Sequence, residues 1–296
     1  MKNSIFALVA LISLSFVACN KDEDIVIDNP DDNQETPTLK IDYKVVEYTP
    51  APGQYINESM NVATPHEACE FAEAKLSSSQ YVSLGAWGGY IVVKFNQTIF
   101  NNGDYDFAIS SNTFDTSNEP GIVWVMQDVN GNGLPDESWY ELKGSYFGEV
   151  GYERNYWVTY FRPGVKENTP WIDSNGETGE VKWMNGYHSQ DFYYPEWIKE
   201  DSYTLYGSRL PSRAEQDDIT GIWQNKPYEW GYADNFGADF LNSTHQNRFR
   251  ISDAVTETNE PANLMSIDFV KVQTAINGSA SILGENSTEV MGFYPL

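Results

Sequence analysis

Short segments in which apolar and polar residues alternate fill the chain from residue 81 to its end. This alternation is typical of a β-strand with one buried face, and Gly, Asn, Asp, Ser or Pro bounds each segment. The segments are YVSLGAWGGYIVVKFNQTIF, YDFAIS, GIVWVMQ, SWYELKG, NYWVTYFRP, SYTLYGSRL, NRFRIS, SIDFVKVQTAI and STEVMGFY. No long amphipathic helical pattern and no fixed-period repeat accompanies them. We therefore predict an all-β fold of two packed antiparallel sheets, and not a βαβ, propeller or solenoid architecture.

One strand and one short helix are expected before this region. LKIDYKVVEY (39–48) has the pattern of a strand, and TPHEACEFAEAKL (64–76) that of a helix. Thr64 suits the N-cap, Pro65 suits the first helical position, and Glu67 completes a capping box. Ala68, Phe71, Ala72 and Leu76 then give the helix a narrow apolar face.

The first 38 residues indicate export and lipid anchoring. Residues 1–18 have one lysine followed by an apolar run too short for a comfortable membrane span, as in a secretory signal peptide. The following SFVAC resembles a bacterial lipobox with Phe16 in place of the usual Leu, which makes Cys19 the lipidated residue. The next residues, NKDED, resemble the signal that sends Bacteroidetes lipoproteins to the outer face of the outer membrane. The acidic, Asn- and Pro-containing remainder of 19–38 predicts a flexible tether, with the folded domain at 39–296.

Charge and cysteine content exclude several classes of function. With 18 Lys+Arg against 43 Asp+Glu the formal net charge is −25, which disfavours nucleic acid and an anionic membrane surface as partners. Contact with the membrane is thus expected only through the lipid. Apart from Cys19 the chain has only Cys69, so no intramolecular disulfide is expected. The three histidines show no zinc-ligand spacing.

The segment DVNGNGLPDE (128–137) matches the first half of a calcium-binding loop. Oxygen ligands are expected at positions 1, 3, 5, 7 and 9 of such a loop, with Gly at position 6. The candidate ligands are Asp128, Asn130, Asn132, the Leu134 carbonyl, Asp136 and Glu137. Trp139 stands where the bidentate Glu of a complete loop belongs, and no helices flank the segment. We predict a structural Ca²⁺ that stiffens a hairpin, the alternative being a plain turn built on two Asn-Gly pairs.

Residues 164–235 interrupt the strand pattern with aromatic residues spaced irregularly among polar residues and Gly. Long loops on a rigid β scaffold often carry function, whereas disordered segments are poor in aromatics. We predict that several rings of this insertion face a ligand, the alternative being that they pack the loop onto the sheets. The ligand-binding candidates are Trp183, Tyr187, Tyr193, Tyr194, Trp197, Trp223 and Trp230.

The order of the strand motifs carries a resemblance. LGAWGGYIVVKFNQTI resembles the first core strands of a galactose-binding-like jelly roll. GIVWVMQD…ESWYELKG resembles its central hairpin and IDFVKVQT…NSTEVMGF its closing strand pair. Together with the tether, the motifs resemble a family of Bacteroidetes outer-surface lipoproteins, some of which are linked to vitamin B12 capture beside outer-membrane transporters. The resemblance implies a jelly-roll fold, a TonB-dependent transporter as partner and cobalamin as ligand.

We therefore expect a surface-exposed binding lipoprotein of the outer membrane that captures a nutrient, with cobalamin favoured. A carbohydrate-binding lipoprotein of a glycan-utilisation system is the alternative. No G-x-S-x-G, HExxH or P-loop pattern is present, so no enzymatic activity is predicted. A glycoside hydrolase is the third possibility, with a carboxylate pair among Glu196, Glu200, Asp201, Glu229 and Asp234, although coincidence explains such pairs in a chain with this many acids. A purely structural surface protein is the fourth. The acidic cluster ADNFGAD (233–239), with Asp234 and Asp239, is a weaker candidate for calcium, and a solvated loop is the favoured interpretation.

Overall fold

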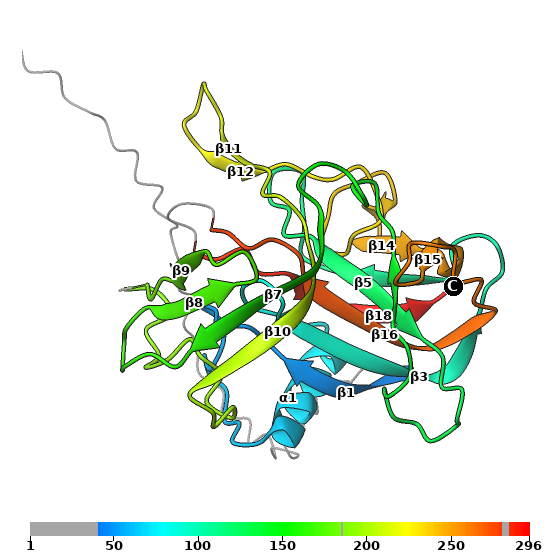
Figure 1. Ribbon diagram of the computed structural model, residues 1–296, viewed down its shortest axis with the longest axis horizontal. Coiled ribbons are helices and arrows are strands. Elements are labelled where there is room, and N and C mark those ends of the chain that lie inside the picture. The colour runs from blue at the N-terminus through cyan, green and yellow to red at the C-terminus, as the bar shows by residue number, and fades with distance from the viewer. Residues whose placement is uncertain (1–40, 185, 280–283) are drawn as a thin grey trace, which may run out of the picture. The chain divides into compact units, whose positions relative to one another are not determined.

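Antiparallel pairings join six strands into the largest sheet of the protein (Figure 1). The computed structural model describes residues 41–184, 186–279 and 284–296. In spatial order the six strands are β1 (Tyr43–Thr49), β3 (Tyr90–Phe100), β16 (Ser266–Thr274), β5 (Gly121–Met126), β6 (Tyr140–Leu142) and β15 (Ala254–Val255). The central strands β3, β16 and β5 come from distant parts of the sequence, so the sheet ties both ends of the described chain together. These strands bury side chains on both faces, since the consecutive residues Ile91, Val92 and Val93 of β3 are each 1% exposed or less.

A second antiparallel sheet shares the main hydrophobic core with the first. It contains β13 (Phe240–Leu241), β14 (Gln246–Phe249), β4 (Phe107–Ser110) and β18 (Gly292–Pro295), in that order. Phe107 and Phe249 stack with their ring centroids 5.3 Å apart, and Tyr43 of β1 meets Phe293 of β18 edge-on at the same distance. One core therefore draws side chains from both sheets, as in a β-sandwich, and the prediction of a mainly β protein with antiparallel sheets is confirmed.

Three strands of the 164–235 insertion join β7 (Glu153–Phe161) in a separate sheet, in which β7 and β10 (Ser202–Arg209) were predicted from the sequence and β8 (Thr169–Asp173) and β9 (Thr178–Val181) were not. The strand order of this sheet is β10, β7, β8 and β9. It buries aromatic side chains such as Tyr156 and Tyr160 against Trp87, whose ring meets that of Tyr156 edge-to-face at 4.6 Å. Two shorter pairs complete the strand inventory of the described residues: β11 (Ala214–Gln216) with β12 (Trp223–Asn225), and β2 (Val82–Ser83) with β17 (Glu289–Val290).

The predicted helix is present as α1 (Pro65–Ser77), and its capping box forms as expected. The Thr64 side chain accepts from the Glu67 N–H at 3.2 Å, and the Glu67 carboxylate accepts from the Thr64 N–H at 3.0 Å. Ala68, Ala72 and Leu76 are buried against the main core. A 3-10 turn, Ile251–Asp253, precedes β15. The described residues contain no helical segment with the length and hydropathy needed to span a bilayer.

All of these elements belong to one unit, Pro37–Leu296. The predicted signal peptide (1–18), the lipidation site Cys19 and the tether (19–38) lie outside the described residues. Cys69 is half-buried on α1, where it packs against the main core as a free thiol.

Candidate metal centre and adjoining pocket

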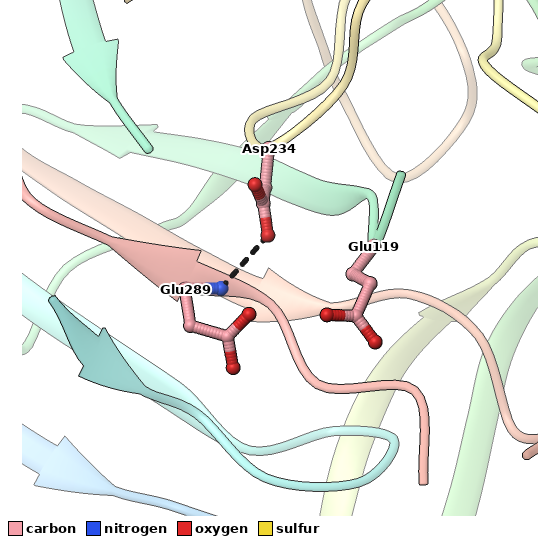
Figure 2. Close-up of side chains that lie close together, drawn as sticks. All are labelled: Glu119, Asp234 and Glu289. Atoms are coloured by element: carbon pink, nitrogen blue, oxygen red, sulfur yellow. Dashed lines mark hydrogen bonds between the residues drawn. The ribbon is translucent and has the colours of Figure 1, made fainter. Parts of the chain in front are cut away.

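Three carboxylates that are far apart in the sequence meet beside the pair formed by β2 and β17 (Figure 2). Glu119 lies just before β5, Asp234 lies in the loop that follows β12, and Glu289 opens β17. One carboxylate oxygen from each lies within 4.8 Å of the other two. Asp234 and Glu289 are 1% and 3% exposed, and Glu119 is partly buried. We call these three residues the carboxylate cluster.

Backbone hydrogen bonds hold the three residues in place. The Gly121 N–H donates to the Ala233 carbonyl at 2.9 Å, and the Glu119 N–H donates to the Asp234 carbonyl at 3.1 Å, which joins two of the loops. The Glu289 N–H donates to Oδ2 of Asp234 at 2.9 Å. Asp234 adopts a left-handed φ of 53°, an uncommon conformation for a residue other than Gly that Asp tolerates better than most. The chain thus accepts local strain where it delivers this carboxylate.

Without a bound cation, the three carboxylates of the cluster are in an electrostatically unfavourable environment. Burial raises the pKa of Glu119 to about 7. Burial, and then repulsion from Glu119, holds the pKa of Asp234 well above its ordinary range. Burial and both neighbouring carboxylates do the same to the pKa of Glu289. A carboxylate cluster without a cation therefore retains protons at a pH where isolated carboxyls are ionised.

Two oxygens of the cluster are buried without a hydrogen-bond partner, Oδ1 of Asp234 and Oε1 of Glu289. Buried polar atoms are nearly always paired, so an orphaned oxygen calls for a partner. A divalent cation bound among the three carboxylates would neutralise the repulsion and give oxygens of the cluster a partner. The donor set is entirely oxygen, which suits Ca²⁺, Mg²⁺ or Mn²⁺ and not the softer metals. The residues present therefore fit a hard divalent cation.

A polar pocket of about 240 Å³ opens beside the cluster, and Glu119 and Glu289 form part of its wall. Its other lining residues are Gln54, Tyr55, Tyr81, Asn112, Ser117, Asn225, Glu285 and Ser287. Tyr55 and Tyr81 meet edge-to-face with centroids 5.9 Å apart. Burial also raises the pKa of Glu285 to about 7, and Oε1 of Glu285 accepts from the Gln54 N–H at 2.7 Å. Carboxylates, amides, two serine hydroxyls and two phenol rings thus face one small space.

The predicted loop 128–137 has the internal hydrogen bonds of a cation-binding turn. Oδ2 of Asp128 accepts from the Gly133 N–H at 3.0 Å. Oδ1 of Asn130 accepts from the Asn132 N–H, and Oδ1 of Asn132 from the Leu134 N–H, both at 2.8 Å. These side-chain to backbone bonds curl the segment into a turn, which both the calcium prediction and the plain-turn alternative expect.

The same loop also has internal partners that compete with a cation. Lys94 Nζ lies 2.9 Å from Oδ2 of Asp128, and this pairing lowers the pKa of the Asp128 carboxyl. Asp136 accepts from the Asn132 amide at 2.9 Å, and Oε1 of Glu137 accepts from the Asn130 N–H at 3.0 Å. Oδ1 of Asp128 and Oε2 of Glu137 are nevertheless buried without a partner. Cation binding by the loop therefore stays a prediction.

Three of the predicted ligand-binding aromatics are buried in the protein. Tyr193, Tyr194 and Trp197 are 1%, 0% and 4% exposed. The Tyr193 hydroxyl donates to the His188 carbonyl, and the Tyr194 hydroxyl donates to the Glu200 carbonyl. Trp197 packs in the main core, tilted against Tyr48. These three rings present no face to solvent. They pack the insertion onto the rest of the protein, which was the alternative to ligand binding.

The four other predicted rings retain some exposure but do not share one surface pocket. Tyr187 is 75% exposed and Trp223 is 38% exposed. Trp223 lies two residues before the pocket residue Asn225 on β12, so the two side chains leave the strand on the same face. Trp183 is partly buried and donates from Nε1 to the Gln190 carbonyl. Trp230 lines a different cavity.

The acidic segment 233–239 is not a solvated loop, and that interpretation was wrong. Asp234 and Asp239 are 1% and 2% exposed, and the backbone of the segment hydrogen-bonds to Gly121 of β5 and Arg248 of β14, which are far from it in the sequence or on another strand. The other carboxylates considered for hydrolysis, Glu196, Glu200, Asp201 and Glu229, are exposed and do not join the cluster.

Sequence reasoning missed Glu119, Glu285 and Glu289. One signal was available for Glu289, since a Glu inside the apolar strand motif STEVMGFY has few ways to reach solvent.

No family model matches the chain, and no curated protein matches it.

Proposed function

We propose that the chain is a cell-surface binding lipoprotein whose ligand enters the pocket beside the carboxylate cluster and binds with the help of Ca²⁺. The observation that carries the proposal is the pair of orphaned buried oxygens, Oδ1 of Asp234 and Oε1 of Glu289, at the edge of a polar pocket. Ca²⁺ takes six to eight oxygen ligands, and the cluster supplies three carboxylates. Pocket water or ligand hydroxyls complete the coordination. The jelly-roll topology, the outer-membrane location and a TonB-dependent transporter as partner are parts of this proposal that rest on the sequence resemblances.

The pocket favours a carbohydrate over cobalamin as the ligand. A volume of about 240 Å³ suits one sugar residue and is too small to enclose a corrin macrocycle. Hydroxyl groups fit its lining, because carboxylates and amides such as Glu285 and Asn225 accept and donate around the ring. Tyr55 and Tyr81 offer aromatic surface for the apolar face of a sugar. Cobalamin capture, which the resemblance implies, needs a larger surface formed with another part of the protein or with a partner.

The proposal is tested by isothermal titration of the purified chain with a glycan panel and with cobalamin, each in Ca²⁺ and in EDTA. We expect binding of a glycan in Ca²⁺ and at least tenfold weaker binding in EDTA. Glu289→Gln should abolish the calcium effect, whereas the exposed control Glu196→Gln should leave it unchanged. Glycan binding that is the same in Ca²⁺ and EDTA, or cobalamin binding alone, would contradict the proposal.

A glycoside hydrolase is the second candidate, favoured by the pKa values of two pocket residues. Glu119 and Glu285 both line the pocket, and burial raises the pKa of each to about 7. A carboxyl that remains protonated near neutral pH can serve as a general acid. The glycan that binds should therefore also be incubated with the protein and assayed for reducing ends. Turnover that Glu285→Gln removes while binding persists would assign catalysis to the pocket.

A further inference from the structure

A second cavity, of about 210 Å³, lies between the loop that precedes β4 and the loop that follows β12. Three basic side chains line it, Lys143, Arg248 and Arg250, in a chain whose formal net charge is −25. Its aromatic lining is Tyr105, Trp230 and Phe249, and its acidic lining is Asp239 and Asp253. None of these residues belongs to the carboxylate cluster or to the pocket beside it.

The two arginines of this cavity are oriented but not paired. The guanidinium groups of Arg248 and Arg250 lie 4.1 and 4.2 Å from the ring centroid of Tyr105, so cation–π contacts fix their positions. Neither side chain makes a hydrogen bond or ion pair with any described residue, and Nε of Arg248 is buried without a partner. The other arginine side chains all bond to protein oxygens: Arg154, Arg162, Arg209 and Arg213.

Two guanidiniums held in place without a hydrogen bond or ion pair form a preorganised anion site, although Asp239 and Asp253 attract them from across the cavity. The guanidinium fork matches a carboxylate or phosphate, and it needs little further ordering when the side chain is already fixed. A surface arginine without a partner is ordinarily solvated, but water does not reach the buried Nε of Arg248. Lys143 adds a third positive charge on the exposed side of the cavity. An anionic ligand therefore fits this cavity better than a neutral one.

The acidic residues limit the charge of the ligand and indicate a second functional group. Asp239 accepts from the Gly231 N–H through Oδ2 at 3.0 Å, while its Oδ1 is buried without a partner. A hydroxyl of the ligand can donate to this oxygen. Because Asp239 and Asp253 are also on the wall, a singly charged carboxylate is repelled less than a dianionic phosphate. The indole of Trp230 offers a surface for the ligand's apolar face.

We propose that the cavity bounded by Tyr105, Trp230 and Arg248 binds a small hydroxylated carboxylic acid of the sugar-acid class. The carboxylate pairs with Arg248 and Arg250, and a hydroxyl donates to Asp239. Sites for drug-sized molecules have volumes of ~300–1,000 Å³. The cavity is smaller, so its volume limits the ligand to about one sugar residue. The site is independent of the cation proposed for the carboxylate cluster.

The test is titration of the full folded chain with D-glucuronate, D-glucose and inorganic phosphate, each in EDTA. We expect glucuronate to bind at least tenfold more tightly than either of the others, because only glucuronate has both groups that the site requires. Arg248→Gln should weaken glucuronate binding at least tenfold, and Arg248→Lys by less. Arg213→Gln is the matched control, since Arg213 stacks on Tyr228 at 5.1 Å outside this cavity. Its glucuronate affinity should stay unchanged.

The proposal would be overturned if glucose bound as tightly as glucuronate, if phosphate bound more tightly, or if Arg248→Gln had no effect. Loss of glucuronate binding in Glu289→Gln would also overturn it, because that result would move the ligand to the other pocket. Lys143 is exposed, so Lys143→Gln tests the charge requirement even if the arginine variant does not fold. We expect a severalfold loss of affinity in Lys143→Gln, and unchanged affinity would count against the site.

Discussion

The backbone N–H of Glu289 donates to Oδ2 of Asp234 across 2.9 Å, although the two residues lie 55 positions apart in the sequence. This bond fixes one oxygen of Asp234 and leaves its Oδ1 unpartnered and buried, as is Oε1 of Glu289. The fold therefore brings together carboxylates that repel one another and satisfies only some of their oxygens with protein donors. Such an arrangement gains stability from a cation in a way that an ordinary hydrogen-bonded core does not.

The first prediction concerns Glu289→Gln. In the wild-type protein, Ca²⁺ at a hundred times its Kd should stabilise the folded state by about 2.7 kcal/mol, or roughly 5–10 °C in Tm. The variant should lose this increase at the cluster, because a neutral amide is a weaker ligand than a carboxylate. In EDTA it should be at least as stable as the wild type, since one of three mutually repelling groups is gone. Thermal melting in both buffers measures this, and an unchanged calcium shift would remove the cluster as a metal site.

The second prediction is a pH dependence that calcium reduces. Burial raises the pKa of Glu119 and of Glu285 to about 7 in the folded state, so between pH 4.5 and 7 the folded chain binds more protons than the unfolded chain. The stability these groups contribute is fully present below pH 4.5 and is lost as the pH rises through 7. Tm in EDTA should therefore decline from pH 5 to pH 8.

Calcium should reduce this decline, because it binds the ionised form of the cluster and its affinity increases with pH. Glu285→Gln offers a matched variant outside the cluster, since the amide oxygen can still accept from the Gln54 N–H. The decline in EDTA should be shallower in this variant. A Tm in EDTA that is higher at pH 8 than at pH 5 would show that the buried carboxyls do not dominate the pH response.

Much of the fold follows from the sequence, because the relevant signals are local. The strand segments keep their alternation, and the capping box of Thr64 and Glu67 marks the start of α1. The sheet formed by β7, β8, β9 and β10 was only partly foreseen, since TPWID and TGEV are short and weakly alternating. Their pairing is decided by aromatic packing against Trp87 rather than by their own pattern.

The site was much harder to predict than the fold, because its residues meet only through tertiary contacts. Asp234 lies in a polar segment that the sequence alone gives no reason to bury, and strand pairing places Glu289 opposite Ser83 of β2. Spacing motifs detect sites made by one loop, as at 128–137, and are silent on sites assembled from three. The insertion is rich in aromatic residues because some of them pack together and not because they bind a ligand. Tyr193 and Tyr194, for example, lie in a separate hydrophobic cluster.

The third prediction concerns the loop at 128–137. If this loop binds a cation as its spacing predicts, calorimetry should count two calcium ions per chain, and Glu137→Gln should reduce the count to one. Oε2 of Glu137 is one of the two orphaned oxygens of the loop, so its loss removes a ligand without breaking the Lys94–Asp128 pair. Asp115→Asn, at an exposed acidic position outside the loop, is the control. A count of one in the wild type that Glu289→Gln reduces to zero would leave the loop as a plain turn.

The fourth prediction tests the turn that supports the pocket wall. Gly85 has a φ of +72°, and a Cβ placed on it would lie 2.0 Å from the Ala51 carbonyl oxygen. Its N–H donates to Oγ of the pocket residue Ser287 at 3.0 Å. Gly85→Ala should destabilise the protein by about 3 kcal/mol or more, because backbone strain adds to a clash with backbone that cannot move freely. Denaturant unfolding measures the difference.

Gly103→Ala is the matched control for this change. Its φ of +81° is similar, but nothing lies within 4 Å of the added Cβ. The control isolates the conformational cost of a left-handed residue, about 1–2 kcal/mol. Equal destabilisation by the two substitutions would mean that the contact between Gly85 and Ala51 relaxes easily and does not constrain the turn.

The fifth prediction separates the pocket from the aromatic surface that the sequence suggested. Tyr81 lines the pocket and meets Tyr55 edge-to-face, whereas Tyr187 is 75% exposed and lies outside the pocket lining. Tyr81→Ala should weaken glycan binding about tenfold, near 1.4 kcal/mol, through lost ring contact, with the calcium stoichiometry unchanged. Tyr187→Ala should bind the glycan as the wild type does. Calorimetry of both variants in saturating calcium measures their glycan affinity. A loss of affinity confined to Tyr187→Ala would place the ligand on the exposed rings of the insertion instead of in the pocket.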